Sequence, residues 1–181
     1  MTELELRITR VGLRSASLLQ IHPDDSQKLA PLAASSLGEL RAGHSATEGP
    51  RAYSLGPTEW LLIDYPFQDV RRRLSTDLGR ALVRVTDISA AFTSLKVEGA
   101  GARAVLASDI GAPWAAHSSR PGQYVRTRLG HVEVVLHCVG PDSFEVLVDR
   151  SVADHLEAWL AARSAEQAPA GASDPGPLRV Q

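Results

Sequence analysis

The stretch Gly56-Pro57-Thr58-Glu59-Trp60-Leu61-Leu62-Ile63-Asp64 reads as a tight turn, an aromatic-led apolar strand and an aspartate. The residues that follow, through Leu74, have the spacing of an amphipathic helix. The same series recurs 84 residues later, from Gly140-Pro141-Asp142-Ser143-Phe144 to Asp149, and a helical stretch again follows, through Leu160. A repeated strand-and-helix unit indicates a chain built from two related halves. The predicted fold class is therefore α+β, with two related α/β sandwich halves.

The chain divides by composition into three parts. We expect an N-terminal α+β half over residues 1–84, a second half over 85–164, and a tail rich in Ala, Pro and Gly over 165–181. The second half reads β-α-β-β-β-α, which is close to a ferredoxin-like sandwich with one extra strand. The tail holds too little apolar surface to fold alone, so we expect it to be flexible or held by a partner.

The first half contains strand and helix signals around the repeated stretch. Residues 4–21 have strand character, and a short helix carrying Leu29, Leu32 and Ala33 should follow. The strand from Trp60 is apolar on both faces, which predicts a central position in its sheet. Beyond it, one helix should bury a face formed by the apolar residues Phe67, Val70, Leu74 and Leu78.

Composition excludes several classes of protein. The 181 residues are 44% hydrophobic and 22% charged, with a formal net charge of -2, so neither nucleic acid nor an anionic membrane is an expected partner. Cys138 is the single cysteine, which excludes an intrachain disulfide and a cysteine-based zinc site. No apolar run approaches the roughly 20 residues of a membrane span. The start, Met1 to Glu5, has no signal-peptide pattern, and a cytoplasmic location is predicted.

One strand carries residue types that could bind a metal. His131, Glu133 and His137 share a face if side chains alternate. The two histidines are six residues apart, roughly 20 Å at about 3.3 Å per residue, which is too far to share one ion. We therefore expect this face to be solvated or to meet a partner. Cys138 should point to the opposite, apolar face as a small core residue.

Two other motifs have structural and functional readings. Gly99-Ala100-Gly101-Ala102 lies between a strand and a helix, as phosphate-binding turns do, but it lacks the third glycine, and no Gly-Lys-Ser/Thr follows. Tight strand-to-helix packing is favoured. Arg71, Arg72 and Arg73 could form an anion site, but one helix face cannot present three consecutive residues. A solvated helix face is favoured.

The longest loop gathers Trp114, His117, Arg120 and Tyr124 in or beside it. These residues could meet a ligand. A subunit contact is preferred, because Trp, Tyr and Arg are enriched at the centres of interfaces. Nucleophile-elbow, paired-carboxylate and zinc motifs are missing. The sequence therefore predicts no catalytic, cofactor-binding or metal-binding residue in this chain.

The chain from Leu55 to Leu160 resembles the gamma, or small, subunit of heterotetrameric sarcosine oxidases. The resemblance rests on five blocks in the family's order: Leu55-Gly56-Pro57-Thr58-Glu59-Trp60-Leu61-Leu62; Val85-Thr86-Asp87-Ile88-Ser89; Leu95-Lys96-Val97-Glu98-Gly99-Ala100-Gly101-Ala102-Arg103; Pro121-Gly122-Gln123-Tyr124-Val125-Arg126-Thr127-Arg128-Leu129-Gly130; and Phe144-Glu145-Val146-Leu147-Val148-Asp149-Arg150-Ser151.

The same blocks are similar, more distantly, to the folate-binding aminomethyltransferase fold of the glycine-cleavage T-protein. This chain lacks that family's C-terminal barrel. It also reads Ser108-Asp109-Ile110-Gly111 where those enzymes carry a Thr-Asn-Asp-type segment with a catalytic aspartate. Asp109 is therefore not assigned a catalytic role.

The resemblance implies a subunit of a larger oxidase. Such complexes demethylate sarcosine to glycine, form peroxide and pass the one-carbon unit to tetrahydrofolate. FAD, FMN, NAD and tetrahydrofolate would be bound by the alpha and beta flavoprotein subunits, and a small delta subunit would complete the complex. The gamma subunit would be a non-catalytic assembly element.

Two other functions stay open at this point. The first is a free-standing, folate-binding one-carbon protein, whose pocket Asp109, Trp114 and Tyr124 would rim. The second is a homodimeric adaptor of unrelated function.

Overall fold

The apolar strands form two antiparallel sheets in the computed structural model, which describes residues 6–25, 45–77, 82–110 and 120–167. The larger sheet has the order β1 (Arg7–Val11), β6 (Phe92–Glu98), β9 (Ser143–Asp149), β8 (Val132–Gly140), β7 (Tyr124–Leu129). The smaller has the order β3 (Arg51–Gly56), β4 (Glu59–Ile63), β2 (Ala16–Ile21), β5 (Val83–Asp87). The described helices are α2 (Phe67–Asp77), α3 (Ala102–Ile110) and α5 (Ala153–Gln167), with short 3-10 turns η1 (Pro23–Asp25) and η2 (Arg150–Val152).

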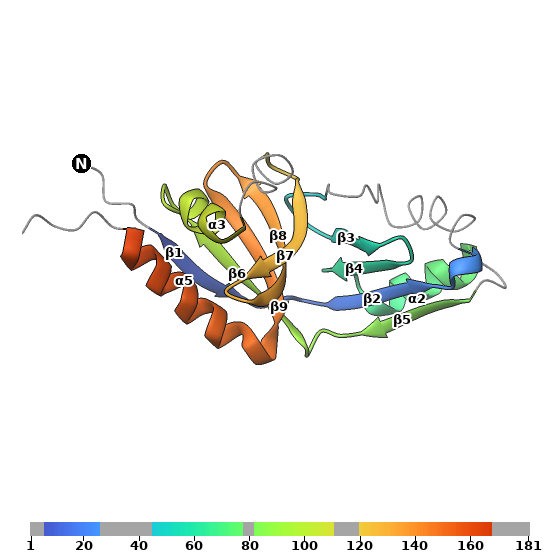
Figure 1. Cartoon of the computed structure of the whole chain (residues 1–181). Helices are drawn as coiled ribbons and strands as arrows, with labels where there is room; N and C mark the ends of the chain where they lie inside the picture. The colour runs from blue at the N-terminus through green and yellow to red at the C-terminus, as the bar shows by residue number, and fades with distance from the viewer. Residues whose placement is uncertain (1–5, 26–44, 78–81, 111–119, 168–181) are drawn as a thin grey trace, which may run out of the picture.

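The helices cover the outer faces of the two sheets (Figure 1). Alternate residues of the larger sheet, among them Leu95, Leu136 and Phe144, form one core with α3 and α5. Alternate residues of the smaller sheet, such as Trp60 and Leu62, form a second core with α2. The inner faces of both sheets supply a third buried cluster. The layers are therefore helix, sheet, sheet, helix.

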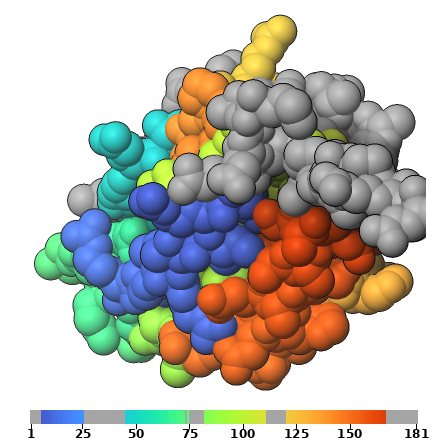
Figure 2. All heavy atoms as spheres, turned by 90° about the vertical axis from the view of Figure 1, so that its left-hand side faces the viewer, coloured from blue at the N-terminus to red at the C-terminus, as the bar shows by residue number. Residues whose placement is uncertain are grey.

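The sequence repeat corresponds to a repeat of strand order. The order β8-β9-β6-β1 in the larger sheet matches the order β3-β4-β2-β5 in the smaller one. Strand β1 thus occupies in the larger sheet the place that β5 occupies in the smaller one. It pairs with β6 from Arg7 opposite Glu98 to Val11 opposite Ser94. Figure 2 shows the N-terminal strands beside α5, and Arg10 forms ion pairs of 2.6 and 2.7 Å with two carboxylates of that helix.

The fold class is as predicted: an α+β chain with two antiparallel sheets. The central position of β4, the helix over Val70 and Leu74, and the β-α-β-β-β-α order of the second half are also confirmed. The division of the chain at residue 84 stays a prediction. Strand β1 precedes this boundary but pairs with β6 beyond it, and β5 runs from one side of the boundary to the other.

Other expectations differ from the structure or fall outside it. The strand character predicted over residues 4–21 is confirmed for the described residues, which the structure divides into two strands that belong to different sheets. Helix α5 continues to Gln167, so the segment predicted as tail begins inside a helix. The predicted helix around Leu29 and the residue Leu78 lie outside the described residues. In the described part of the chain, no helix has the length and apolar character to cross a membrane.

Candidate functional site: a polar cavity between the sheets

Three buried aromatic side chains join the inner faces of the two sheets. Tyr53 of β3 and His137 of β8 are connected by a hydrogen bond of 3.0 Å between the tyrosine hydroxyl and Nδ1. The ring of Tyr124, from β7, meets Tyr53 edge-on at 4.9 Å, and its hydroxyl accepts a hydrogen bond from the Ser54 amide at 2.6 Å. Burial raises the pKa of Tyr53, so its hydroxyl stays protonated at neutral pH.

Tyr53 and His137 are separated by the period of the sequence repeat, 84 residues. They occupy equivalent positions on β3 and β8 and meet each other between the sheets. The two halves therefore contact through the same strand position of each, as expected when two repeats pack about an approximate two-fold axis.

A cluster of charged side chains lies next to this aromatic group. Arg51 of β3 forms ion pairs with Glu145 of β9 and, at 3.3 Å, with Asp64. The Ser94 hydroxyl donates to the other Glu145 oxygen at 2.8 Å. The side chains of the three charged residues are only 9 to 14% exposed. One arginine thus neutralises two largely buried carboxylates and ties the smaller sheet to the larger.

Asp64 is held in place by its backbone and by its carboxylate. It follows β4 with a φ of 62°, a left-handed conformation that aspartate tolerates better than most residues. Its Oδ1 accepts a hydrogen bond from the Arg14 amide at 3.0 Å. The turn after the repeated strand therefore aims its aspartate at the junction of the sheets.

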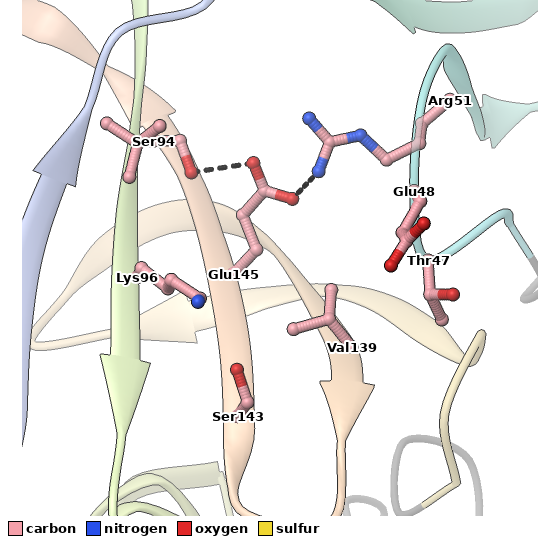
Figure 3. Close-up of a pocket in the computed structure, with 9 residues that line it drawn as sticks. Thr47, Glu48, Arg51, Ser94, Lys96, Val139, Ser143 and Glu145 are labelled. Atoms are coloured by element: carbon pink, nitrogen blue, oxygen red, sulfur yellow. Dashed lines mark hydrogen bonds and ion pairs between the residues drawn. The ribbon is translucent and has the colours of Figure 1, made fainter.

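The charged cluster borders a cavity of about 540 Å³ between the sheets. Figure 3 shows Ser94 and Lys96 of β6 and Ser143 and Glu145 of β9 on one side, with Arg51 and the segment before it on the other. The lining residues are Val11, Thr47, Glu48, Arg51, Ser94, Lys96, Val139, Ser143 and Glu145. Its volume lies within the range of sites for small organic molecules.

The chemistry of the cavity is that of binding rather than proton transfer. Both oxygens of Glu145 are engaged, one by Arg51 and one by Ser94. Lys96 pairs with Glu98 at 2.8 Å, which lowers the pKa of the Glu98 carboxyl. Within the described ranges, no three His, Cys, Asp or Glu side chains are grouped so that they could hold a metal ion.

The prediction that the face of β8 with His137 is solvated is wrong. His131 lies in the β7–β8 turn with a φ of 68°, and Glu133 is exposed, but His137 is fully buried. Strand β8 has neighbouring strands on both sides, and the smaller sheet covers the face that carries His137. Cys138 does point into the core on the other face, as predicted, and burial raises the pKa of its thiol.

The glycine-rich turn at Gly99 and the arginines of α2 have the structural roles that were favoured for them. Gly99 has a φ of 117°, and its carbonyl accepts from the amide of Ala102, which is fully buried at the start of α3. The residues pack the strand tightly against the helix. Arg71 and Arg72 are exposed, and Arg72 pairs with Asp69 at 2.8 Å, so these two form a solvated helix face; the side chain of Arg73 lies outside the described part.

Two of the residues that would have rimmed a folate pocket, Asp109 and Tyr124, lie near opposite ends of β7. Asp109 accepts a hydrogen bond from the Gly130 amide at 2.9 Å, beyond the last residue of β7. Tyr124 is the first residue of β7 and lies between the sheets. Trp114 and His117 lie outside the described residues, and Arg120 is exposed. Asp109 and Tyr124 therefore contribute to different ends of one strand.

Sequence reasoning missed Arg51, Lys96 and Glu145. One signal could have revealed Glu145, which is the lone charge in the apolar run from Phe144 to Val148. A single carboxylate in an otherwise buried strand requires a partner, since an unpaired buried charge is costly. The identity of that partner depends on sheet packing and has no local signal.

The model of the family described as "Sarcosine oxidase, gamma subunit family" matches residues 42–166 of this chain. No curated protein sequence matches it. Among solved structures, a chain of the heterotetrameric sarcosine oxidase from Corynebacterium sp. U-96 is similar with a TM-score of 0.76 and 23% identity. The match covers 92% of this chain and 87% of that one.

A second similar structure is the glycine cleavage system aminomethyltransferase T from Bartonella henselae. Its TM-score is 0.59 at 17% identity, over 87% of this chain. The match covers 46% of that protein, so this chain spans less than half of the longer fold.

Proposed function

The chain belongs to the sarcosine oxidase gamma subunit family, and from this premise we propose that it acts as the small assembly subunit of a heterotetrameric oxidase. The complex would demethylate sarcosine oxidatively to glycine, form peroxide and transfer the one-carbon unit to tetrahydrofolate. The observation that carries the proposal is the family match over residues 42–166. The similarity to a heterotetrameric sarcosine oxidase chain over 92% of this chain is in accord with it.

The catalytic groups would belong to the other subunits. We propose that alpha and beta flavoprotein subunits bind FAD, FMN, NAD and tetrahydrofolate, that a small delta subunit completes the complex, and that it works in the cytoplasm. The internal pairing of the site supports a non-catalytic role for this chain. Arg51 and Ser94 engage both carboxylate oxygens of Glu145, which suits a rigid support better than an acid or base.

Affinity purification of the tagged full-length chain from its own cytoplasm tests this proposal. We expect two larger polypeptides to co-purify, the eluate to be yellow, and sarcosine to generate peroxide in it. The same tag on an unrelated protein of similar size controls for adventitious capture. A colourless chain that elutes alone under gentle conditions, or as a dimer by light scattering, would contradict the assembly role.

A further inference from the structure

The internal repeat shows that the two halves place different side chains at equivalent positions facing the cavity. Leu18 of β2 lies opposite Leu61 of β4 in the smaller sheet. At the equivalent position of the larger sheet, Lys96 of β6 lies opposite Glu145 of β9. Both pairs face the space between the sheets. The fold therefore accepts a pair of leucines where the second half carries a lysine and a glutamate.

The same contrast continues along the strands. Ala16 of β2, which is fully buried among apolar residues, is the counterpart of Ser94 of β6. The first half thus fills these positions with apolar side chains. The second half instead places hydroxyl and charged groups around a cavity of about 540 Å³. Because the architecture is shared, the polar lining is a property of this cavity rather than of the fold.

Lys96 is the positive charge of the cavity that can meet a ligand. Arg51 is already neutralised by two carboxylates and is 11% exposed. Lys96 is 43% exposed, and its partner Glu98 does not line the cavity. Ion pairs at such exposure are weak, so an incoming anion can share the ammonium group. Glu48, the other acidic lining residue, is an exposed loop residue and is screened by water.

The remaining lining complements an anion with an apolar body. The hydroxyls of Thr47 and Ser143 can donate hydrogen bonds, while Val11 and Val139 offer apolar surface. Val11 is 39% exposed and lines the cavity, so part of its apolar surface is open to a ligand. We infer that this cavity binds a small organic carboxylate, with its charged group on Lys96 and its apolar part against the two valines. This inference does not depend on the proposed function.

The lysine content of the chain allows a direct test, since Lys28 and Lys96 are its only lysines. Reductive methylation with carbon-13 formaldehyde gives each of them one dimethylamino signal in the NMR spectrum and keeps the positive charge. The probes are cinnamate and its neutral amide, cinnamamide, added to the full-length chain. The α-amino group of Met1 gives a third signal, so Lys96→Gln identifies the Lys96 signal by its loss, and Lys28→Gln identifies that of Lys28 in the same way.

We expect cinnamate to shift the Lys96 signal saturably, and cinnamamide to leave it unmoved. In calorimetry on unmodified protein, Lys96→Gln should weaken cinnamate binding by about tenfold to a hundredfold, the usual range for a hydrogen bond to a charged group. Lys28→Gln should bind as the parent does. An unmoved Lys96 signal, equal shifts from the amide, or parental affinity in Lys96→Gln would overturn the inference.

Discussion

The substitution Arg51→Met should destabilise the protein by about 3–5 kcal/mol, the usual cost of removing one partner of a buried ion pair. The estimate follows from the surroundings of the guanidinium. Glu145 and Asp64 are 9% and 14% exposed at the side chain, and both face Arg51. Without the arginine, two like charges would remain in a site with little water. Urea unfolding of the full-length chain, followed by tryptophan fluorescence, to which the buried Trp60 contributes, measures the loss.

Two further variants separate this mechanism from the general effects of losing an arginine. Arg72→Met removes an exposed pair with Asp69 and should cost less than about 1 kcal/mol. Arg51→Met combined with Glu145→Leu should recover much of the loss, because Leu61 fills the equivalent position of the other sheet. The reasoning is refuted if Arg51→Met costs no more than Arg72→Met, or if the double variant is no more stable than the single one.

Three other regions give separate predictions. Gly130→Ala should cost about 2 kcal/mol or more, because its φ is 55° and a Cβ would lie 2.8 Å from the Trp159 ring; Gly49→Ala, with a φ of 73° and open space, should cost clearly less in the same urea assay. Cys138 should react with a thiol reagent at least about a hundredfold more slowly in the native protein than in urea, since the thiol is buried and its pKa is raised; equal rates would contradict this. Asp149→Ala removes a cap and should cost about 1 kcal/mol at neutral pH. Hydrogen bonding lowers the folded-state pKa of Asp149, so its contribution is present above its unfolded pKa and is lost as pH falls through the folded one. The difference in unfolding free energy between the parent and Asp149→Ala should therefore vanish in strong acid. A difference that does not change with pH would refute the role of the Asp149 carboxylate as a cap.

Local periodicity predicted much of the fold because the strands are short and their apolar faces are distinct. The alternation in the second half placed Cys138 and its neighbours in the core, and the doubly apolar strand from Trp60 was correctly placed inside its sheet. The Gly-Pro turns located the repeat, since proline and glycine restrict the backbone in ways that few other residues do. These signals depend on neighbours within a few residues.

The candidate site could not be predicted in the same way, because its residues meet through the packing of one sheet on the other. His137 occupies an alternating polar position that is typical of a solvent-facing residue, yet the smaller sheet covers it. His137 and Tyr53 are separated by the repeat period of 84 residues, but a sequence repeat does not indicate which faces of the two copies pack together. Arg51 lies 94 residues from Glu145, and the local sequence around either residue does not indicate that the two are partners.

The position of β1 has a consequence for how the chain emerges from the ribosome. Its partner residues, Ser94 to Glu98, are synthesised roughly 90 residues later, a delay of about 4–18 s at ordinary translation rates. During that interval β1 lacks the strand with which it pairs, and its unpaired backbone groups could pair with other nascent chains. Two of its five residues, Arg7 and Arg10, are charged, which disfavours such pairing. The larger sheet cannot form until translation has passed β6, so the first strand to be synthesised depends on a partner that is made much later.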